Sequence, residues 1–124
     1  MSTARVFGFK FADLQKIVEA DELFKNALGL AHRRTIIPVS KLSNIFLLIR
    51  YYLPLLPYGD IIEIGSYRGR CALFISYLCR ETGLGSTIFA PDTFKGMPET
   101  NRSVDLHSMG DFDGVNLDEL IFCR

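Results

Sequence analysis

Apolar residues recur at helical spacing in the first part of the chain. Residues 12–28 carry them three or four positions apart, as Leu14, Ile17, Val18, Leu23, Ala27 and Leu28. This spacing predicts one amphipathic helix that ends at Gly29. Residues 32–39 should be extended, because the proline near their end disfavours helical geometry before it. Ser40 can then cap a second helix over residues 41–52, which is apolar on most faces and should therefore be buried.

A different pattern follows. Residues 61–64 form a short β-branched run typical of a buried parallel strand, residues 70–82 a largely apolar helix, and residues 86–91 a second strand. Strand, helix and strand make one βαβ unit, so the strands should be parallel. Residues 92–115 are loop-like, and a last helix should begin near Asn116. One such unit cannot complete a doubly wound sheet, so we expect a piece of a larger enzyme or pairing with another chain.

Composition narrows the function classes. The chain has 124 residues, 48% of them hydrophobic, and no net charge, as expected for about one globular domain without a nucleic-acid footprint. Its most apolar segment, residues 44–59, contains Arg50 and two prolines and is shorter than the roughly 20 apolar residues of a membrane span. We find no signal-peptide pattern. Three cysteines without CxxC spacing favour reduced thiols over a zinc site. We therefore expect a cytoplasmic protein without membrane contact.

The stretch "DIIEIGSYRGRC", residues 60–71, raises the question of chemistry because two glycines enclose a turn after the first strand. A phosphate-binding P-loop would need Lys-Ser/Thr after its last glycine, where Arg70-Cys71 stands. A dinucleotide fingerprint would need glycine at Tyr67. The dehydrogenase variant GxxxGxG lacks its last glycine, which is Cys71 here. A methyl-donor turn and a plain tight turn remain open.

The wider context resembles one family. "IIEIGSYRGR" is followed by "FAPDTFKGMPE", with 29 positions between Glu63 and Asp92 (92 − 63). The pair is similar to the two motifs of macrocin O-methyltransferases, a family of class I S-adenosylmethionine-dependent enzymes. "GDFDGVNLDEL" resembles the next element of that family, and the resemblance spans roughly residues 35–122. Arg70 departs from it, because a second glycine is usual there. Cys71 and Pro91 depart too.

The resemblance implies roles for residues of both motifs. Glu63 would face the cationic amino group of S-adenosyl-L-methionine, Gly65 would allow close approach, and Asp92 would accept the ribose hydroxyls. The implied donor-binding residues are Glu63, Gly65, Ser66, Tyr67, Arg68, Gly69, Asp92, Thr93 and Phe94. Simpler roles stay open: Glu63 can cap the following helix, Asp92 can form an Asx turn, Arg68 can be a surface charge, and Tyr67 can cover the helix.

The fold implied is α/β: the N-terminal half of a Rossmann-like class I methyltransferase with an incomplete parallel sheet, preceded by helices. Residues 1–58 would form the helical segment. Residues 59–124 would form the first part of the donor-binding domain, which we expect to be truncated. Unpaired strand edges would then favour a homo-oligomer or aggregation.

The implied reaction is methylation of a hydroxyl on a sugar-like small molecule, with this chain as the donor-binding part. Family members carry magnesium ligands and a candidate base in a later half. We find neither in this chain, so we name no catalytic or metal-binding residue. The acidic residues Asp105, Asp111, Asp113 and Asp118 favour a solvated loop and helix start, and neither His32 nor His107 has a partner pattern. The alternatives are a non-catalytic nucleotide-binding fragment and an NAD-linked oxidoreductase.

Overall fold

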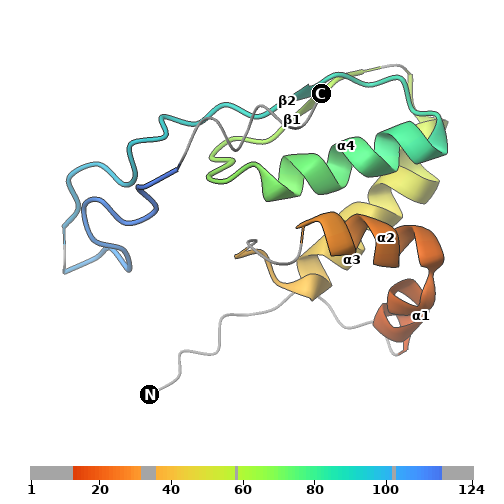
Figure 1. Ribbon diagram of the computed structural model, residues 1–124, viewed down its shortest axis with the longest axis horizontal. Coiled ribbons are helices and arrows are strands. Elements are labelled where there is room, and N and C mark those ends of the chain that lie inside the picture. The colour runs from red at the N-terminus through yellow and green to blue at the C-terminus, as the bar shows by residue number, and fades with distance from the viewer. Residues whose placement is uncertain (1–12, 32–35, 58, 102, 116–124) are drawn as a thin grey trace.

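A computed structural model describes residues 13–31, 36–57, 59–101 and 103–115 (Figure 1). Most helices come first, and a βαβ unit follows them. In chain order the elements are α1 (Leu14–Ala20), α2 (Glu22–Ala31), α3 (Val39–Leu47), the π-helix η2 (Leu48–Tyr52), the 3₁₀-helix η3 (Leu53–Leu55), β1 (Ile61–Ile62), α4 (Arg70–Thr82) and β2 (Ile88–Phe89). The helix expected near Asn116 lies outside the described residues.

The single helix expected over residues 12–28 is wrong, because the chain breaks at Asp21. Its backbone is extended there, with ψ at 128°, and its side chain caps the next helix. Oδ1 of Asp21 accepts hydrogen bonds from the amides of Leu23 and Phe24 at 2.8 and 3.3 Å. Such a cap satisfies amides that have no partner inside the helix. The helix that Asp21 starts also passes the expected stop at Gly29 and ends at Ala31.

The next helix begins earlier than predicted. Pro38 precedes it in an extended conformation, so α3 starts at Val39. Ser40 lies inside the first turn and does not cap the helix, which corrects that prediction. The helical path continues through η2 and η3, and it ends at Leu55 instead of near Tyr52. The end still falls among prolines, as the sequence indicates.

The βαβ unit is confirmed. β1 and β2 are parallel, with Ile61 opposite Ile88, and α4 has the predicted bounds, followed by Gly83 in the left-handed conformation. The strands are shorter than expected, but the ladder continues beyond β1: the Glu63 amide donates to Phe89 O at 2.8 Å and the Gly65 amide to Pro91 O at 3.0 Å. The elements that lead into the turn are therefore held in register up to its first glycine.

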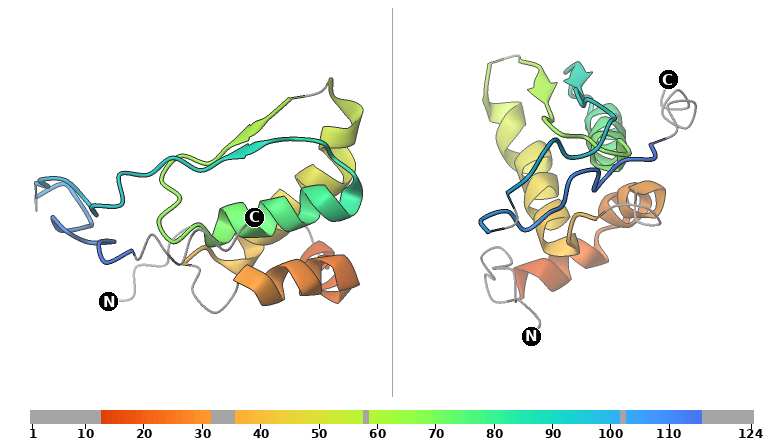
Figure 2. Two further views of the ribbon diagram at one scale, coloured as in Figure 1. Left: turned by 45° about the horizontal axis from the view of Figure 1, so that its top comes forward. Right: turned by 90° about the vertical axis from the view of Figure 1, so that its left-hand side faces the viewer.

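The core lies between α4 and the N-terminal helices (Figure 2). Phe24 of α2 contacts Phe46 of α3 and Phe74 of α4 edge to face, with ring centroids 5.4 and 5.8 Å apart. All three rings are at most 1% exposed. Since aromatic side chains bury large areas, this trio joins three helices at one point. It gives α4 a fixed base from which the β1–α4 turn projects.

The two faces of the sheet differ. Ile61 and Ile88 pack against the core, whereas Ile62, Ile64 and Phe89 are 63%, 83% and 51% exposed. The expected burial of the first strand is therefore wrong for its outer face. The architecture is a set of helices and a small parallel sheet covered on one face. Over the described ranges, no helix combines the length and the hydropathy needed to cross a bilayer.

Candidate functional site

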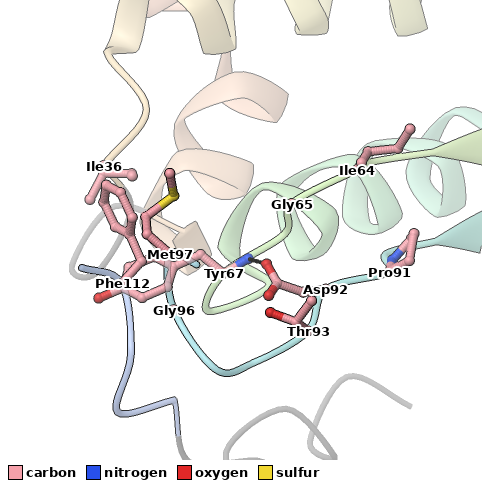
Figure 3. Close-up of a pocket in the computed structure, with 10 residues that line it drawn as sticks. All are labelled: Ile36, Ile64, Gly65, Tyr67, Pro91, Asp92, Thr93, Gly96, Met97 and Phe112. Carbon is pink, nitrogen blue, oxygen red and sulfur yellow. Dashed lines mark hydrogen bonds between the residues drawn. The ribbon is translucent and has the colours of Figure 1, made fainter. Parts of the chain in front are cut away.

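A pocket of about 660 Å³ opens where β1 and β2 end at their carboxyl sides (Figure 3). Ligands of open α/β sheets bind in this position. Residues from both predicted motifs, from the segment before α3 and from the loop after residue 109 line it: Ile36, Ile64, Gly65, Tyr67, Pro91, Asp92, Thr93, Gly96, Met97 and Phe112. Apolar side chains predominate, and Asp92 and Thr93 supply the polar ones.

The β1–α4 turn depends on left-handed backbone conformations. Gly65, Tyr67 and Gly69 have φ values of 78°, 52° and 65°. Glycine adopts this region without penalty, whereas a residue with a side chain rarely does so. Tyr67 is therefore the residue in this turn whose conformation needs outside support.

Asp92 supplies that support and joins the two motifs. Its Oδ2 accepts a hydrogen bond from the Tyr67 amide at 2.7 Å, and its Oδ1 accepts one from the Phe94 amide at 2.8 Å. The second bond is the Asx turn that the sequence left open. A carboxylate offers about four lone-pair sites, so both oxygens keep capacity for a ligand's hydroxyl groups. Figure 3 shows the Asp92 carboxylate next to the Tyr67 amide, with a dashed line for the hydrogen bond between them.

The second motif folds onto the loop that follows it. Met97 N donates to Asp111 O at 2.7 Å, and Gly110 N donates to Met97 O at 3.0 Å. Gly96 has φ 74°, and a Cβ placed on it would lie 2.9 Å from three backbone atoms of residues 110–113. No side chain fits there, which explains why this position of the motif is glycine.

One wall of the pocket is aromatic. The ring of Phe112 lies 5.4 Å from that of Tyr67 and 4.7 Å from that of His107, both edge to face. Arg68 places its guanidinium 5.1 Å from the Tyr67 ring centroid. His107 Nδ1 is also 3.5 Å from Asp111 Oδ2. The Tyr67 ring thus contacts both a cation and a second ring, and the sequence predicted neither contact.

Glu63 immediately precedes the β1–α4 turn, two positions before Gly65. Burial raises the pKa of its carboxyl above the ordinary 4.5, the Cys71 thiol and the Ala72 backbone amide lower it through hydrogen bonds, and the charge of Asp92 raises it. The Ala72 amide lies in the first turn of α4, so this interaction supports the helix-capping role that the sequence left open. The Oε2 atom of Glu63 is buried and has no hydrogen-bond partner among the described residues. One side of this carboxyl remains available for a ligand.

Two further residues of the turn have structural partners. Ser66 is buried, and its hydroxyl donates to Ala90 O at 3.0 Å, which ties the turn to the second strand. Burial, together with the charge of Glu63 and its hydrogen bond, raises the pKa of the Cys71 thiol to about 12. Cys71 is therefore a protonated thiol at neutral pH. Both Cys71 and Cys79 are free thiols buried in α4.

The structure brings most of the nine predicted site residues together. Gly65, Tyr67, Asp92 and Thr93 line the large pocket, and Glu63, Gly65, Ser66, Tyr67 and Arg68 line a small cavity beside it. Gly69 precedes α4, and Phe94 follows the Asx turn with φ 56°; neither lines a cavity described here.

The sequence did not assign Ile36, Ile64, Pro91 or Phe112 to the pocket. "GDF" at residues 110–112 was the available signal for Phe112, because it resembles a family element.

The side chains that could bind a metal ion in this chain are those of His, Cys, Asp and Glu. Within the described ranges, no three His, Cys, Asp or Glu side chains are grouped as metal ligands. His32 lies outside these ranges, as does Asp118. Asp111 Oδ2 accepts the Ser108 amide at 3.0 Å and approaches His107, so the loop's own groups occupy it.

Comparison with known proteins identifies the family. The sequence model described as macrocin-O-methyltransferase (TylF) matches residues 35–116, which is more than half of the chain. The chain belongs to the macrocin O-methyltransferase family. The match includes both motifs around the pocket and indicates an O-methyltransferase, for which the family implies S-adenosylmethionine as methyl donor. No curated protein and no solved structure matches the chain.

Proposed function

We propose that the pocket at the ends of β1 and β2 is the donor site of an S-adenosylmethionine-dependent O-methyltransferase. One observation carries this proposal: the Asp92 carboxylate holds the Tyr67 amide at 2.7 Å and so joins the two family motifs around a pocket of about 660 Å³. Drug-sized ligands occupy pockets of about 300–1,000 Å³. The pocket therefore has the right size for a nucleoside-containing ligand.

The residues present fit the donor part by part. The apolar side chains of Met97 and Phe112, which lie together in Figure 3, suit the adenine ring, and the free lone pairs of Asp92 suit the ribose hydroxyls. The unpartnered Oε2 of Glu63 suits a cationic amino group. Bound S-adenosylmethionine would supply an electrophilic methyl group on a sulfonium.

The protein's own contribution is orientation. Holding two reactants in line can supply much of a rate enhancement. The rigid α4 base and the hydrogen-bonded turn would fix the donor, and Tyr67 and Phe112 would exclude water from it. No described residue is placed as a base, and no described cluster fits magnesium, so we derive no step from either.

The family resemblance implies the class of methyl acceptor. We propose that the methyl acceptor is a hydroxyl group of a sugar-like small molecule. We also propose that the βαβ unit belongs to a Rossmann-like sheet within residues 59–124, and that residues 1–58 form a helical segment in front of it. The exposed outer face of the sheet, with Ile62 and Phe89, supports association into a homo-oligomer, which light scattering would measure.

Isothermal titration calorimetry on the folded chain tests the donor site. S-adenosylmethionine and S-adenosylhomocysteine should bind, and NAD should not, because Tyr67 stands where a dinucleotide turn needs glycine. Absence of binding by both sulfur ligands would refute the donor site and favour a non-catalytic role. Binding of NAD alone would favour the oxidoreductase alternative.

A further inference from the structure

A second, smaller cavity of about 80 Å³ lies beside the large pocket. The two share Ile36, Gly65 and Tyr67 in their walls, so they lie on either side of, or next to, the same glycine turn. The small cavity exceeds the roughly 30 Å³ that one water molecule occupies in the liquid. It has room for a small polar group.

Two residues that line this cavity, Glu63 and Arg70, each have one buried polar atom without a partner, and the two atoms are of opposite kind. Glu63 Oε2 can accept a hydrogen bond, and Arg70 Nε can donate one. Both are buried, and neither has a partner among the described residues. Buried polar atoms are nearly always paired in folded proteins, so two unpaired atoms in one cavity indicate a polar occupant.

A hydrogen-bond acceptor and a hydrogen-bond donor in one cavity match a ligand group that carries both a positive and a negative charge. The proposed function places the donor's amino group at Glu63, and the same carbon of the methionine end carries a carboxylate. We propose that Arg70 binds this α-carboxylate and so acts as a specificity residue for the amino-acid end of the methyl donor. This inference rests on the proposed donor site. Arginine suits the task because its fork of N–H donors matches a carboxylate and always carries its charge.

The test compares ligands that differ in the carboxylate alone. Binding of S-adenosylmethionine and of decarboxylated S-adenosylmethionine is measured by calorimetry on the wild-type chain and on Arg70→Gln, Arg70→Lys and Arg80→Gln. Arg80 lies on the same helix, and its side chain is 72% exposed, so Arg80→Gln is the matched control. Circular dichroism establishes that each variant is folded.

In the wild type, loss of the carboxylate should weaken binding about tenfold or more, as expected for a charged hydrogen bond. Arg70→Gln should bind both ligands about equally, Arg70→Lys should keep part of the preference, and Arg80→Gln all of it. A preference that survives in folded Arg70→Gln would overturn the inference, as would a wild type that binds both ligands equally.

Failure of the proposed donor site can be distinguished from failure of this inference, because the wild type would then bind neither ligand. If Arg70→Gln fails to fold, the comparison of wild type with Arg70→Lys still decides: an unchanged preference and affinity in folded Arg70→Lys, despite the lost fork, contradicts the inference.

Discussion

The helical core and the loops at the ends of the strands are built in different ways. In the core, Phe24, Phe46 and Phe74 are held by packing among apolar neighbours. At the site, single backbone hydrogen bonds and left-handed conformations set the shape, at Tyr67 and Gly96 above all. Packing depends on volume and hydrophobicity, which several residues can provide. A turn held by a side-chain carboxylate, as at Tyr67, needs that carboxylate, and a positive φ without room for a Cβ, as at Gly96, needs glycine. The difference predicts separate responses to mutation.

Phe74→Ala should have the largest effect. It removes a fully buried ring that contacts α2, and such truncations cost about 3–5 kcal/mol. Urea unfolding should show this loss of stability, while donor affinity of the folded fraction stays near that of the wild type. Phe89→Ala, at a side chain 51% exposed, is the control and should cost far less. Equal losses in the two variants would contradict the assignment of the core.

Gly96→Ala should act on the site. The new Cβ would meet three backbone atoms at 2.9 Å with φ at 74°, and backbone strain of this kind costs about 1–3 kcal/mol. We expect a smaller loss of global stability than in Phe74→Ala, together with at least about tenfold weaker binding of S-adenosylhomocysteine.

Gly85→Ala is the control for this change, since a Cβ there meets nothing within 4 Å. It should bind as the wild type does. A Gly96→Ala variant with unchanged affinity would show that the loop over residues 110–113 does not shape the donor pocket.

The same difference explains how much the sequence could predict. The bounds of α4 were predictable because Gly69 and Gly83 mark its ends locally, and the parallel pairing follows from the handedness of βαβ units. The break at Asp21 was missed because the apolar spacing continues through it. The contact of Gly96 with residues 110–113 was missed because it joins backbone atoms, which leave no apolar pattern. Motif strings predicted which residues gather at the site, and distances were needed to show what each does.

Asp92→Asn tests the link between the motifs. An amide keeps one acceptor oxygen, so it can serve the amide of Tyr67 or that of Phe94, and not both. Loss of one hydrogen bond to a charged group costs about 2 kcal/mol. Thermal unfolding and donor titration should both show the loss, since Asp92 supports the turn and, in the proposed site, would bind the donor's ribose. Asp13→Asn, on an exposed side chain, should change neither. A stable Asp92→Asn variant with weakened binding would show instead that Asp92 acts on the ligand alone.

Glu63→Gln should have the smallest effect on stability and the most specific dependence on pH. Burial raises the pKa of this carboxyl above its ordinary 4.5, so the folded state takes up its proton at higher pH than the unfolded state does. The charged form therefore destabilises the fold at neutral pH, and the free energy of unfolding should rise as pH falls from the raised pKa toward 4.5. Because the carboxyl is only partly buried, we expect less than about 1 kcal/mol. Glu63→Gln should remove this part of the pH dependence of stability, and Glu99→Gln, at an exposed position, should keep it.

Binding of S-adenosylmethionine to the wild type should change in the opposite sense, becoming weaker over the same pH range as Glu63 loses its charge. If binding and stability both increased as pH fell, Glu63 would not be the partner of the donor's amino group, and its buried oxygen would belong to the fold alone.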